Sequence, residues 1–282
     1  MKKILLMLLA VLSMASCTQV EKKVTVRWAT FNMRYDNKGD SLNSWSYRKD
    51  RVGQYIKDMK LDVVGTQEVL HHQFEDLKAI LPDYEAVGVG RDDGKTQGEY
   101  SAVYYNKTKF DALATGTFWL AENPDSVGMM GWDAACTRVA TWAKLKEKTT
   151  GKIIMAVNTH FDHVGVEARK QSALLIIRKI KEIVGDQPAV LTGDFNVNDK
   201  SDAYATITTN EFVLKDAHKI AQKTEGVNYT FHGFNKVEPA KREKIDFLFV
   251  TPQINVLNSV IPAEVPEAMV SDHCPNWIEM EF

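Results

Sequence analysis

Asp194 and Asn196 stand two residues apart, directly after a short apolar segment at residues 189–191. Gly193 permits a sharp turn where that segment ends. Because successive side chains of an extended chain point to opposite sides, Asp194 and Asn196 are expected to face one side, with Phe195 toward the core. Taken alone, this motif is most simply a strand followed by an Asx turn. Several other apolar segments of the chain, however, end in polar side chains in the same way.

Six more polar residues end such segments or follow them, namely Asn32, Glu68, His160, Asp246, Asp272 and His273. With Asp194 and Asn196 they supply four carboxylates, two amides and two imidazoles. Ligand and catalytic groups gather where the strands of open α/β sheets end. Carboxylate and amide oxygens suit Mg²⁺ or Mn²⁺, whereas zinc sites use cysteines and paired histidines that are missing from this set. The set therefore predicts a site for a hard divalent cation.

Each of these residues also has a structural interpretation. Asn32 could cap a turn, Glu68 could be the first-turn carboxylate of a following helix, and His160 could be a hydrogen-bonded histidine at a strand end. Asp246 is harder to explain in this way, because it interrupts an apolar strand where an unpaired charge would be costly. His273 is the natural partner for that charge.

The elements that must position these residues follow from hydrophobic periodicity. Strands are expected at 24–32, 62–68, 100–105, 117–120, 139–145, 153–158, 189–191, 229–231, 244–250 and 277–280, and helices at 47–59, 71–81, 166–184 and 201–208. Strands alternate with helices in the first half, and the second half is rich in strands. This order predicts two packed sheets with helices outside, a layered α/β sandwich.

The first seventeen residues have the pattern of a bacterial lipoprotein signal. Lys2 and Lys3 precede an apolar stretch at 4–12 that is too short to span a bilayer, and small residues lead to Cys17. Cys17 is the predicted lipidation site, although Met14 is an imperfect match and ordinary signal cleavage is the competing interpretation. We therefore expect a signal at 1–17, a tether at 18–23, one catalytic domain at 24–282, and an exported protein anchored by lipid to a membrane.

Composition limits the classes of partner. The chain has 282 residues, 44% of them hydrophobic, and a formal net charge of -2. Such a balance gives no general attraction for nucleic acid, although it leaves room for a metal-assisted enzyme that neutralises phosphate within a cleft. Cys136 and Cys274 could form a disulfide after export, or they could be two buried thiols. No surface helix or heptad indicates an oligomer, so a monomer is expected.

Six short motifs occur in one order along the chain: Thr30-Phe31-Asn32, Gln67-Glu68, Asn158-Thr159-His160, Gly193-Asp194-Phe195-Asn196, Ile245-Asp246-Phe247 and Ser271-Asp272-His273. Together they resemble the endonuclease/exonuclease/phosphatase superfamily, which includes deoxyribonuclease I and the neutral sphingomyelinases. The resemblance covers essentially everything after the signal. It implies a four-layer α/β sandwich, with two packed mixed sheets flanked by helices.

The resemblance also implies roles at the metal and the nucleophile. Glu68 would hold Mg²⁺, with Asn32 beside it and Asp272 contributing. His273 would be the general base on the attacking water, held in its tautomer by Asp246. A positioned base of this kind contributes roughly two to four powers of ten in rate.

Further roles concern the phosphate. Asp194 and Asn196 would orient the nucleophile and the phosphate oxygens, and His160 would hydrogen-bond a phosphoryl oxygen or act as the acid. Glu99 resembles the carboxylate that orients His160, and Arg138 resembles a phosphate-contacting arginine.

Trp132 lies in a glycine-containing loop before Arg138. It could line the substrate entrance or pack in the core.

These observations favour an exported, Mg²⁺-dependent phosphoesterase that hydrolyses a phosphomonoester or phosphodiester. A small molecule or a lipid headgroup is expected as substrate before nucleic acid. One alternative is a periplasmic or surface nuclease. A second alternative is a lipid-anchored binding protein on a scaffold that has lost catalysis, which the presence of Glu68, Asp194 and His273 argues against.

Overall fold

The structure of the chain, a computed structural model, describes residues 23–209, 214–263 and 265–282. The predicted signal sequence and Cys17 lie outside these residues and stay predictions. Within the described ranges, no helix combines the length and the apolar character that a membrane crossing needs.

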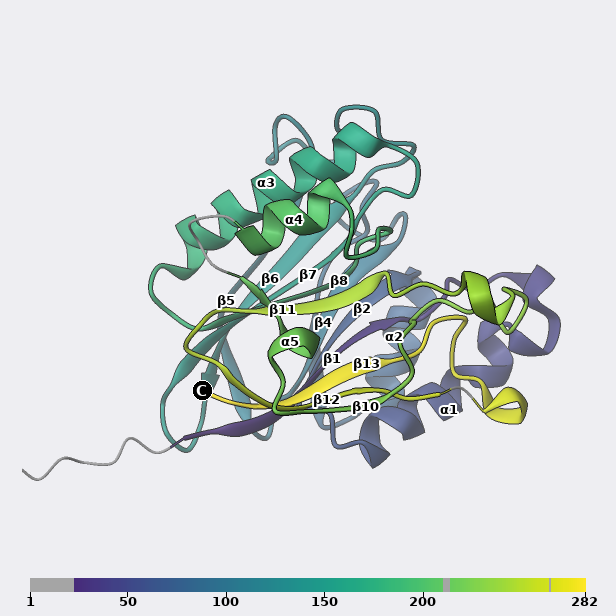
Figure 1. The fold of residues 1–282 in the computed structure, drawn as a ribbon, viewed down its shortest axis with the longest axis horizontal. Coiled ribbons are helices and arrows are strands. Elements are labelled where there is room, and N and C mark those ends of the chain that lie inside the picture. Colours follow the sequence, from purple (N-terminus) through teal and green to yellow (C-terminus); the bar gives the residue numbers. More distant parts are fainter. Residues whose placement is uncertain (1–22, 210–213, 264) are drawn as a thin grey trace, which may run out of the picture.

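Two mixed sheets form the centre of the molecule (Figure 1). Among the described residues, seven strands form one sheet in the order β10 (Lys223–Gly226), β12 (Asn255–Ile261), β13 (Asn276–Glu281), β1 (Thr25–Asn32), β2 (Val63–Val69), β4 (Tyr100–Asn106) and β3 (Tyr84–Val87). Six form the other, in the order β5 (Phe110–Trp119), β6 (Val139–Glu147), β7 (Ile153–His160), β8 (Ala189–Asp194), β11 (Asp246–Val250) and β9 (Lys215–Asp216). The pairs β1–β2 and β7–β8 are parallel, so their carboxyl ends meet.

Helices cover the outer face of each sheet (Figure 1). The helices α1 (Trp45–Asp58) and α2 (His71–Ile80) pack on the seven-stranded sheet, and α3 (Val166–Val184) and α4 (Asp202–Thr209) pack on the six-stranded sheet. Short helical turns lie at η1 (Lys38–Asn43), α5 (Ala217–Ile220), η2 (Pro239–Lys241) and η3 (Pro266–Ala268). Separate apolar clusters fill the space between the sheets and beneath each helical layer. The predicted four-layer α/β sandwich is thus confirmed.

A polar network ties the two sheets together below the strand ends. Gln67 of β2 donates to Asn158 Oδ1 of β7 at 2.6 Å, and Asn158 donates in turn to the Thr66 carbonyl at 2.8 Å. Gly65 allows this close approach, because a Cβ at that position would overlap Thr192 Oγ1 and lie 2.5 Å from Asn158 Oδ1. The network is fully buried, so it fixes the relative placement of β2, β7 and β8.

Most predicted elements occur where the periodicity places them. The expected helix at 166–184 matches α3 to the residue, while the expected strand at 117–120 is the end of the longer β5. One expectation was wrong: residues 229–231 form no regular strand, and Phe231 makes only an isolated bridge with His273. The chain there serves to hold His273, with which the Phe231 ring is in contact at 4.9 Å between centroids.

Candidate active site

Strand pairing brings the predicted residues to one edge of the two sheets. His160 at the end of β7 is in register with Asp194 at the end of β8, and Asp194 is in register with Asp246 at the start of β11. In the other sheet, Asn32 at the end of β1 is paired with Gln67, next to Glu68. The convergence that the motifs imply is therefore present in the fold.

Glu68, Asp194 and His273 form a compact group of ligand atoms. One atom from each lies within 4.8 Å of the others. Glu68 reaches this point because the pairing of β2 with β4 shifts register between Thr66 and Val69, and Glu68 has a φ of 60°. Irregularities of this kind redirect side chains next to functional sites, and the left-handed backbone is strained for a non-glycine residue.

Asn32 lies between the two carboxylates of that group. Its Nδ2 donates to Glu68 Oε1 at 3.1 Å and to Asp194 Oδ2 at 2.9 Å, while its Oδ1 accepts from the Arg34 N–H. The amide thus presents its nitrogen to the carboxylates and holds them side by side. Asp272, the third predicted ligand, is buried next to the group, with its Oδ2 3.8 Å from Arg34 Nε.

His273 and Asp246 form a buried pair. His273 Nδ1 lies 2.8 Å from Asp246 Oδ2, and His273 Nε2 lies 3.8 Å from Asp194 Oδ2. Burial alone would lower the pKa of His273, but the Asp246 carboxylate, with Asp194 and Asp272, outweighs it and raises that pKa to about 10. The pairing that the apolar surroundings of Asp246 predicted is present in the structure.

The charges of this group fit a divalent cation. Burial, followed by the neighbouring Asp246 carboxylate, raises the pKa of Asp194 to about 7. Burial away from water is the larger cause, and the Asp246 carboxylate adds negative charge beside Asp194. A cation held by Glu68 and Asp194 would offset this negative charge, and hard carboxylate oxygens suit Mg²⁺ or Mn²⁺.

His160 is buried beside Asp194 as a neutral imidazole. Asn196, in a left-handed conformation with a φ of 50°, donates through Nδ2 to the Phe161 carbonyl at 3.0 Å and contacts His160 Nε2 at 3.0 Å. Since the carbonyl can only accept, the Asn196 amide is fixed, and His160 Nε2 must accept. The His160 proton therefore sits on Nδ1. Burial, with the charges of Arg138 and Arg91, keeps the pKa of His160 well below its usual range.

Glu99 contacts an arginine more closely than it contacts His160. Glu99 Oε2 accepts from Arg91 Nη1 at 2.8 Å, whereas His160 Nδ1 lies 3.9 Å away, beyond hydrogen-bond distance. The resemblance implied that Glu99 orients His160, but in the structure its hydrogen-bond partner is Arg91. Burial raises the pKa of Glu99, and the charge of Arg91 opposes that shift.

A cleft of about 340 Å³ opens beside this group. It is lined by Arg34, Tyr35, Glu68, Arg91, Glu99, Cys136, Arg138, His160, His163 and Asn196. The sequence motifs indicated Glu68, Glu99, Arg138, His160 and Asn196 as site residues, and they gave no such role to the others. The sequence around these other residues gives little indication of a role. Arg34 and Tyr35 follow Asn32 by only two and three residues, but nothing in the sequence alone indicates which way these side chains turn.

Asp162 organises the Arg138 side of the cleft. Its carboxylate accepts from the backbone N–H groups of Ala135, Cys136, Val164 and Gly165, and it lies 3.7 Å from Arg138 Nε. Burial alone would raise the pKa of Asp162, but these N–H groups hold it well below its usual range.

The ligand atoms of Cys136, Asp162 and His163 also lie within 4.8 Å of one another. Because the Asp162 oxygens are already bonded and face a guanidinium, this second group does not suit a cation. Burial also raises the pKa of the Cys136 thiol, which disfavours the thiolate that a metal needs.

Trp132 and the two cysteines were left with two interpretations each. Trp132 is not among the residues that line the cleft, and it packs against the cluster under α3. These contacts favour packing, and a place for Trp132 at the substrate entrance stays a prediction. Cys136 and Cys274 are not joined by a disulfide in this structure.

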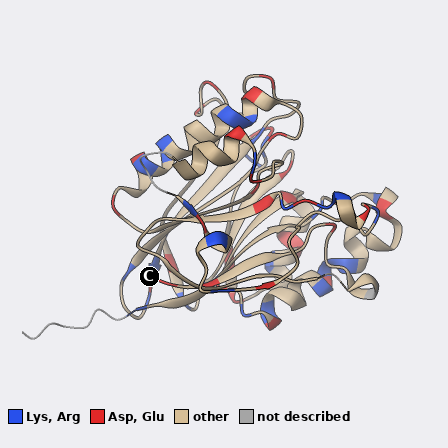
Figure 2. Cartoon of the chain, in the orientation of Figure 1, with Lys and Arg blue, Asp and Glu red and all other residues tan. Residues whose placement is uncertain are grey.

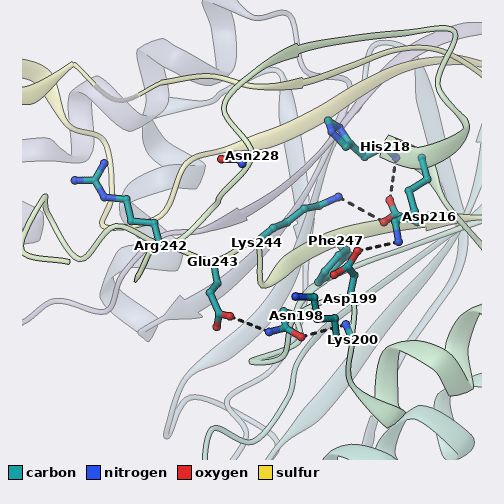
Figure 3. Close-up of a pocket in the computed structure, with 11 residues that line it drawn as sticks. Asn198, Asp199, Lys200, Asp216, His218, Asn228, Arg242, Glu243, Lys244 and Phe247 are labelled. Carbon is teal, nitrogen blue, oxygen red and sulfur yellow. Dashed lines mark hydrogen bonds and ion pairs between the residues drawn. The ribbon is translucent and has the colours of Figure 1, made fainter. Parts of the chain in front are cut away.

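Another pocket lies at the β9 and β11 edge of the six-stranded sheet (Figure 3). The figure shows Lys244 reaching toward Asp216, while Asn198 contacts Glu243. Several of its charged groups pair with one another, as Lys219 does with Asp199 at 2.9 Å. None of the predicted site residues lines this pocket.

Comparison with known proteins agrees with this geometry. A model of the Endonuclease/Exonuclease/phosphatase family matches residues 29–273. An endonuclease/exonuclease/phosphatase of known structure from Bacteroides vulgatus is 68% identical, with a TM-score of 0.91, over 92% of this chain and 99% of that chain.

Two further relatives extend the comparison. A mannosyl-6-phosphatase of known structure from Bacteroides thetaiotaomicron is 37% identical, with a TM-score of 0.85, over 91% of this chain and 100% of that chain. An uncharacterized protein of Acanthamoeba polyphaga mimivirus is 29% identical over 258 residues, which cover 86% of this chain and 94% of the viral protein. With the family match spanning most of the chain and the residues of its motifs gathered at one edge of the sheets, this chain belongs to the endonuclease/exonuclease/phosphatase family.

Proposed function

We propose that the chain is a Mg²⁺-dependent phosphoesterase that hydrolyses a small phosphomonoester, with a phosphorylated sugar as the favoured substrate class. The observation that carries this proposal is the position of the Glu68, Asp194 and His273 group beside a cleft that also presents three arginines, Arg34, Arg91 and Arg138. Crowded carboxylates suit a divalent cation, and arginines suit a phosphate.

His273 would act as the general base. Asp246 accepts the Nδ1 proton, so Nε2 of the neutral imidazole is left free to take a proton from water. Without a cation, the surrounding carboxylates favour the protonated imidazole, as the raised pKa of His273 indicates. Mg²⁺ held by Glu68 and Asp194 would offset that negative charge and would neutralise charge that develops on the phosphoryl oxygens. Asn32 keeps the two carboxylates together for this purpose.

His160 and Arg138 would bind the phosphoryl group, and Asn196 would hold His160 in place through its Nδ2 donor. His160 carries its proton on Nδ1 and therefore donates to an oxygen from that atom. Arg138 lines the cleft, and its Nε and Nη1 have no hydrogen-bond partner among the described residues. These positively polarised donors would stabilise charge on phosphorus-bound oxygens as the bond to the leaving group breaks.

Several observations support a small substrate. The relative of known structure from Bacteroides thetaiotaomicron is named a mannosyl-6-phosphatase. The chain has a formal net charge of -2, and Figure 2 shows acidic and basic residues interspersed along its helices and loops. A protein that binds nucleic acid avidly would be expected to have a basic surface. We further propose that the protein is a monomer, exported and lipid-anchored at Cys17.

A substrate panel tests the proposal. Purified protein would be assayed with p-nitrophenyl phosphate, bis-p-nitrophenyl phosphate, sugar phosphates, inositol phosphates, supercoiled plasmid and RNA, each with Mg²⁺, Mn²⁺ or EDTA. We expect EDTA-sensitive release of phosphate from monoesters, which the His273→Ala variant loses and the matched His72→Ala variant keeps, since His72 lies on the surface of α2. Plasmid cleavage without phosphate release would support the nuclease alternative, and no hydrolysis of any substrate would contradict the proposal.

A further inference from the structure

One wall of the cleft carries buried N–H groups that lack an acceptor. Among the described residues, Arg138 Nε, Arg138 Nη1, Arg91 Nε and His160 Nδ1 have no hydrogen-bond partner. Arg138 is 5% exposed and His160 is 6% exposed, so water does not readily replace the missing acceptors. Buried donors are nearly always satisfied in native proteins, and leaving one unsatisfied is unfavourable. Several such donors around one cleft indicate a ligand that brings acceptors.

Two carboxylates, those of Glu99 and Asp162, lie against these arginines. Glu99 Oε2 accepts from Arg91 Nη1 at 2.8 Å, which turns the remaining edge of that guanidinium away from Glu99. Asp162 lies 3.7 Å from Arg138 Nε, and His163 Nδ1 lies 3.2 Å from Arg138 Nη2. The only other carboxylate contact of Arg91 among the described ion pairs is at 3.8 Å, to the half-exposed Asp92.

Arg91 reaches the cleft from the loop between β3 and β4. The loop folds back on itself, because the Arg91 N–H donates to the Glu99 carbonyl at 3.1 Å and the Asp92 N–H donates to the Gln97 carbonyl at 3.1 Å. Trp119 Nε1 also donates to the Arg91 carbonyl at 2.7 Å. The backbone of Arg91 is thereby fixed on both sides, so the guanidinium is presented to the cleft with little freedom to lose on binding.

We propose that Arg91 and Arg138, with the Nδ1 proton of His160, form an arginine wall that binds the dianionic phosphoryl end of a phosphomonoester, and that Glu99 is the positioning residue of Arg91. This inference rests on the proposed phosphoesterase function. It assigns Glu99 to Arg91 rather than to His160, as the two distances of 2.8 Å and 3.9 Å require.

The arginine wall selects for a monoester because of the number of free oxygens. A phosphomonoester has three non-bridging oxygens and up to two negative charges, so it can face both the arginine wall and the group of Glu68, Asp194 and His273. A diester has two non-bridging oxygens and one charge. Its second alcohol would take the place of an oxygen that otherwise faces either the arginine wall or the group of Glu68, Asp194 and His273. Guanidinium groups match phosphate oxygens in pairs of hydrogen bonds, which makes the discrimination geometric as well as electrostatic.

Steady-state kinetics with a matched pair of substrates test the wall. Arg91→Gln and Arg138→Gln are each expected to lower kcat/KM for p-nitrophenyl phosphate by about 10- to 100-fold, the effect of losing a charged hydrogen bond. For the diester methyl p-nitrophenyl phosphate, Arg91→Gln should lower kcat/KM by no more than about threefold. The control is Arg178→Gln, which changes an exposed arginine of α3. Equal losses for both esters would overturn the assignment of Arg91.

A double-mutant cycle tests the role of Glu99. If Glu99 acts through Arg91, Glu99→Gln raises KM for the monoester, and the Glu99→Gln/Arg91→Gln double variant is no worse than Arg91→Gln alone. If Glu99 instead orients His160, Glu99→Gln lowers kcat and changes its pH profile, and the two losses add in the double variant. The second pattern would refute the positioning role.

Binding of inorganic phosphate separates this inference from the proposed function. Calorimetry in EDTA reports anion binding without metal or turnover. We expect wild-type protein and Arg178→Gln to bind phosphate, with affinity reduced at least about tenfold in Arg91→Gln and Arg138→Gln. If the variants lose phosphate binding but the wild type hydrolyses no substrate, the proposed function is contradicted and the arginine wall is still supported. Unchanged binding in both variants would overturn the wall, whatever the activity.

Discussion

Asp246→Asn is the most direct test of how the site handles protons. Asp246 is 1% exposed and accepts the His273 Nδ1 proton at 2.8 Å, which leaves Nε2 as the base. An amide of the same shape offers an N–H group to Nδ1, so the His273 proton moves to Nε2, which faces Asp194 at 3.8 Å. The imidazole then holds a proton on the atom that should accept one.

The size of the effect follows from that exchange. A general base contributes roughly 10²- to 10⁴-fold in rate, and Asp246→Asn removes that contribution without leaving a cavity. We therefore expect kcat to fall by about 10³-fold, or about 4 kcal/mol in activation free energy, with KM nearly unchanged. The assay is phosphate release from the best monoester at saturating Mg²⁺, with thermal unfolding to verify that the variant is folded.

A matched control exists in the neighbouring strand. Asp216 of β9 is also a buried carboxylate, 4% exposed, but it accepts from Tyr204 and pairs with Lys244 outside the cleft. Asp216→Asn should lower stability and leave kcat within about threefold of wild type, since no reacting group is touched. A folded Asp246→Asn protein that keeps kcat within about threefold would refute the role given to His273.

Three more outcomes are expected. Mg²⁺ should raise the unfolding temperature of the wild type and should fail to do so in Glu68→Gln, which removes one charged ligand; an equal shift in both would place the cation elsewhere. Glu147 accepts three hydrogen bonds from Thr149 and Thr150, and although burial opposes them they lower its pKa to about 2. The Glu147 carboxylate therefore stabilises the fold above about pH 4.5, and this stabilisation is lost as the pH falls toward 2. In denaturant titrations, Glu147→Gln should lower the free energy of unfolding by about 1 to 2 kcal/mol at pH 7 and by less at pH 3. A difference that does not depend on pH would contradict this account. Gly65→Ala should lower the free energy of unfolding by about 1 to 3 kcal/mol, because its Cβ would overlap Thr192 between the sheets; a denaturation midpoint equal to that of the wild type would mean that the sheets can move apart.

The strand ends were predictable because they depend on local sequence. The mainly apolar segments that end at Asn32, His160 and Asp194 form β1, β7 and β8, and each of these polar residues is the last of its strand. Parallel pairing then aligns His160 with Asp194 without further information. The buried partner of Asp246 could also be inferred, because a lone carboxylate in an apolar strand needs one.

The partners on the cleft side were not predictable. Glu99 is eight residues from Arg91 and 61 residues from His160, and the sequence does not say which of them its carboxylate meets. Asp162 follows the His160 motif by two residues, yet its role depends on four N–H groups contributed by two separate loops. Arg34 and Arg91 gave no pattern, since isolated arginines are usually solvated.

Sequence alone determined the layers of this protein, because apolar periodicity decides which faces are buried, and it determined which residues stand at the strand ends. Tertiary structure decided what those residues touch. The register shift in β2 next to Glu68, and the loop that brings Arg91 to the cleft, both depend on contacts between segments far apart in the chain. Such contacts form only after the two sheets pack, and so the chemistry of the cleft depends on distances of a few ångströms that no local pattern encodes.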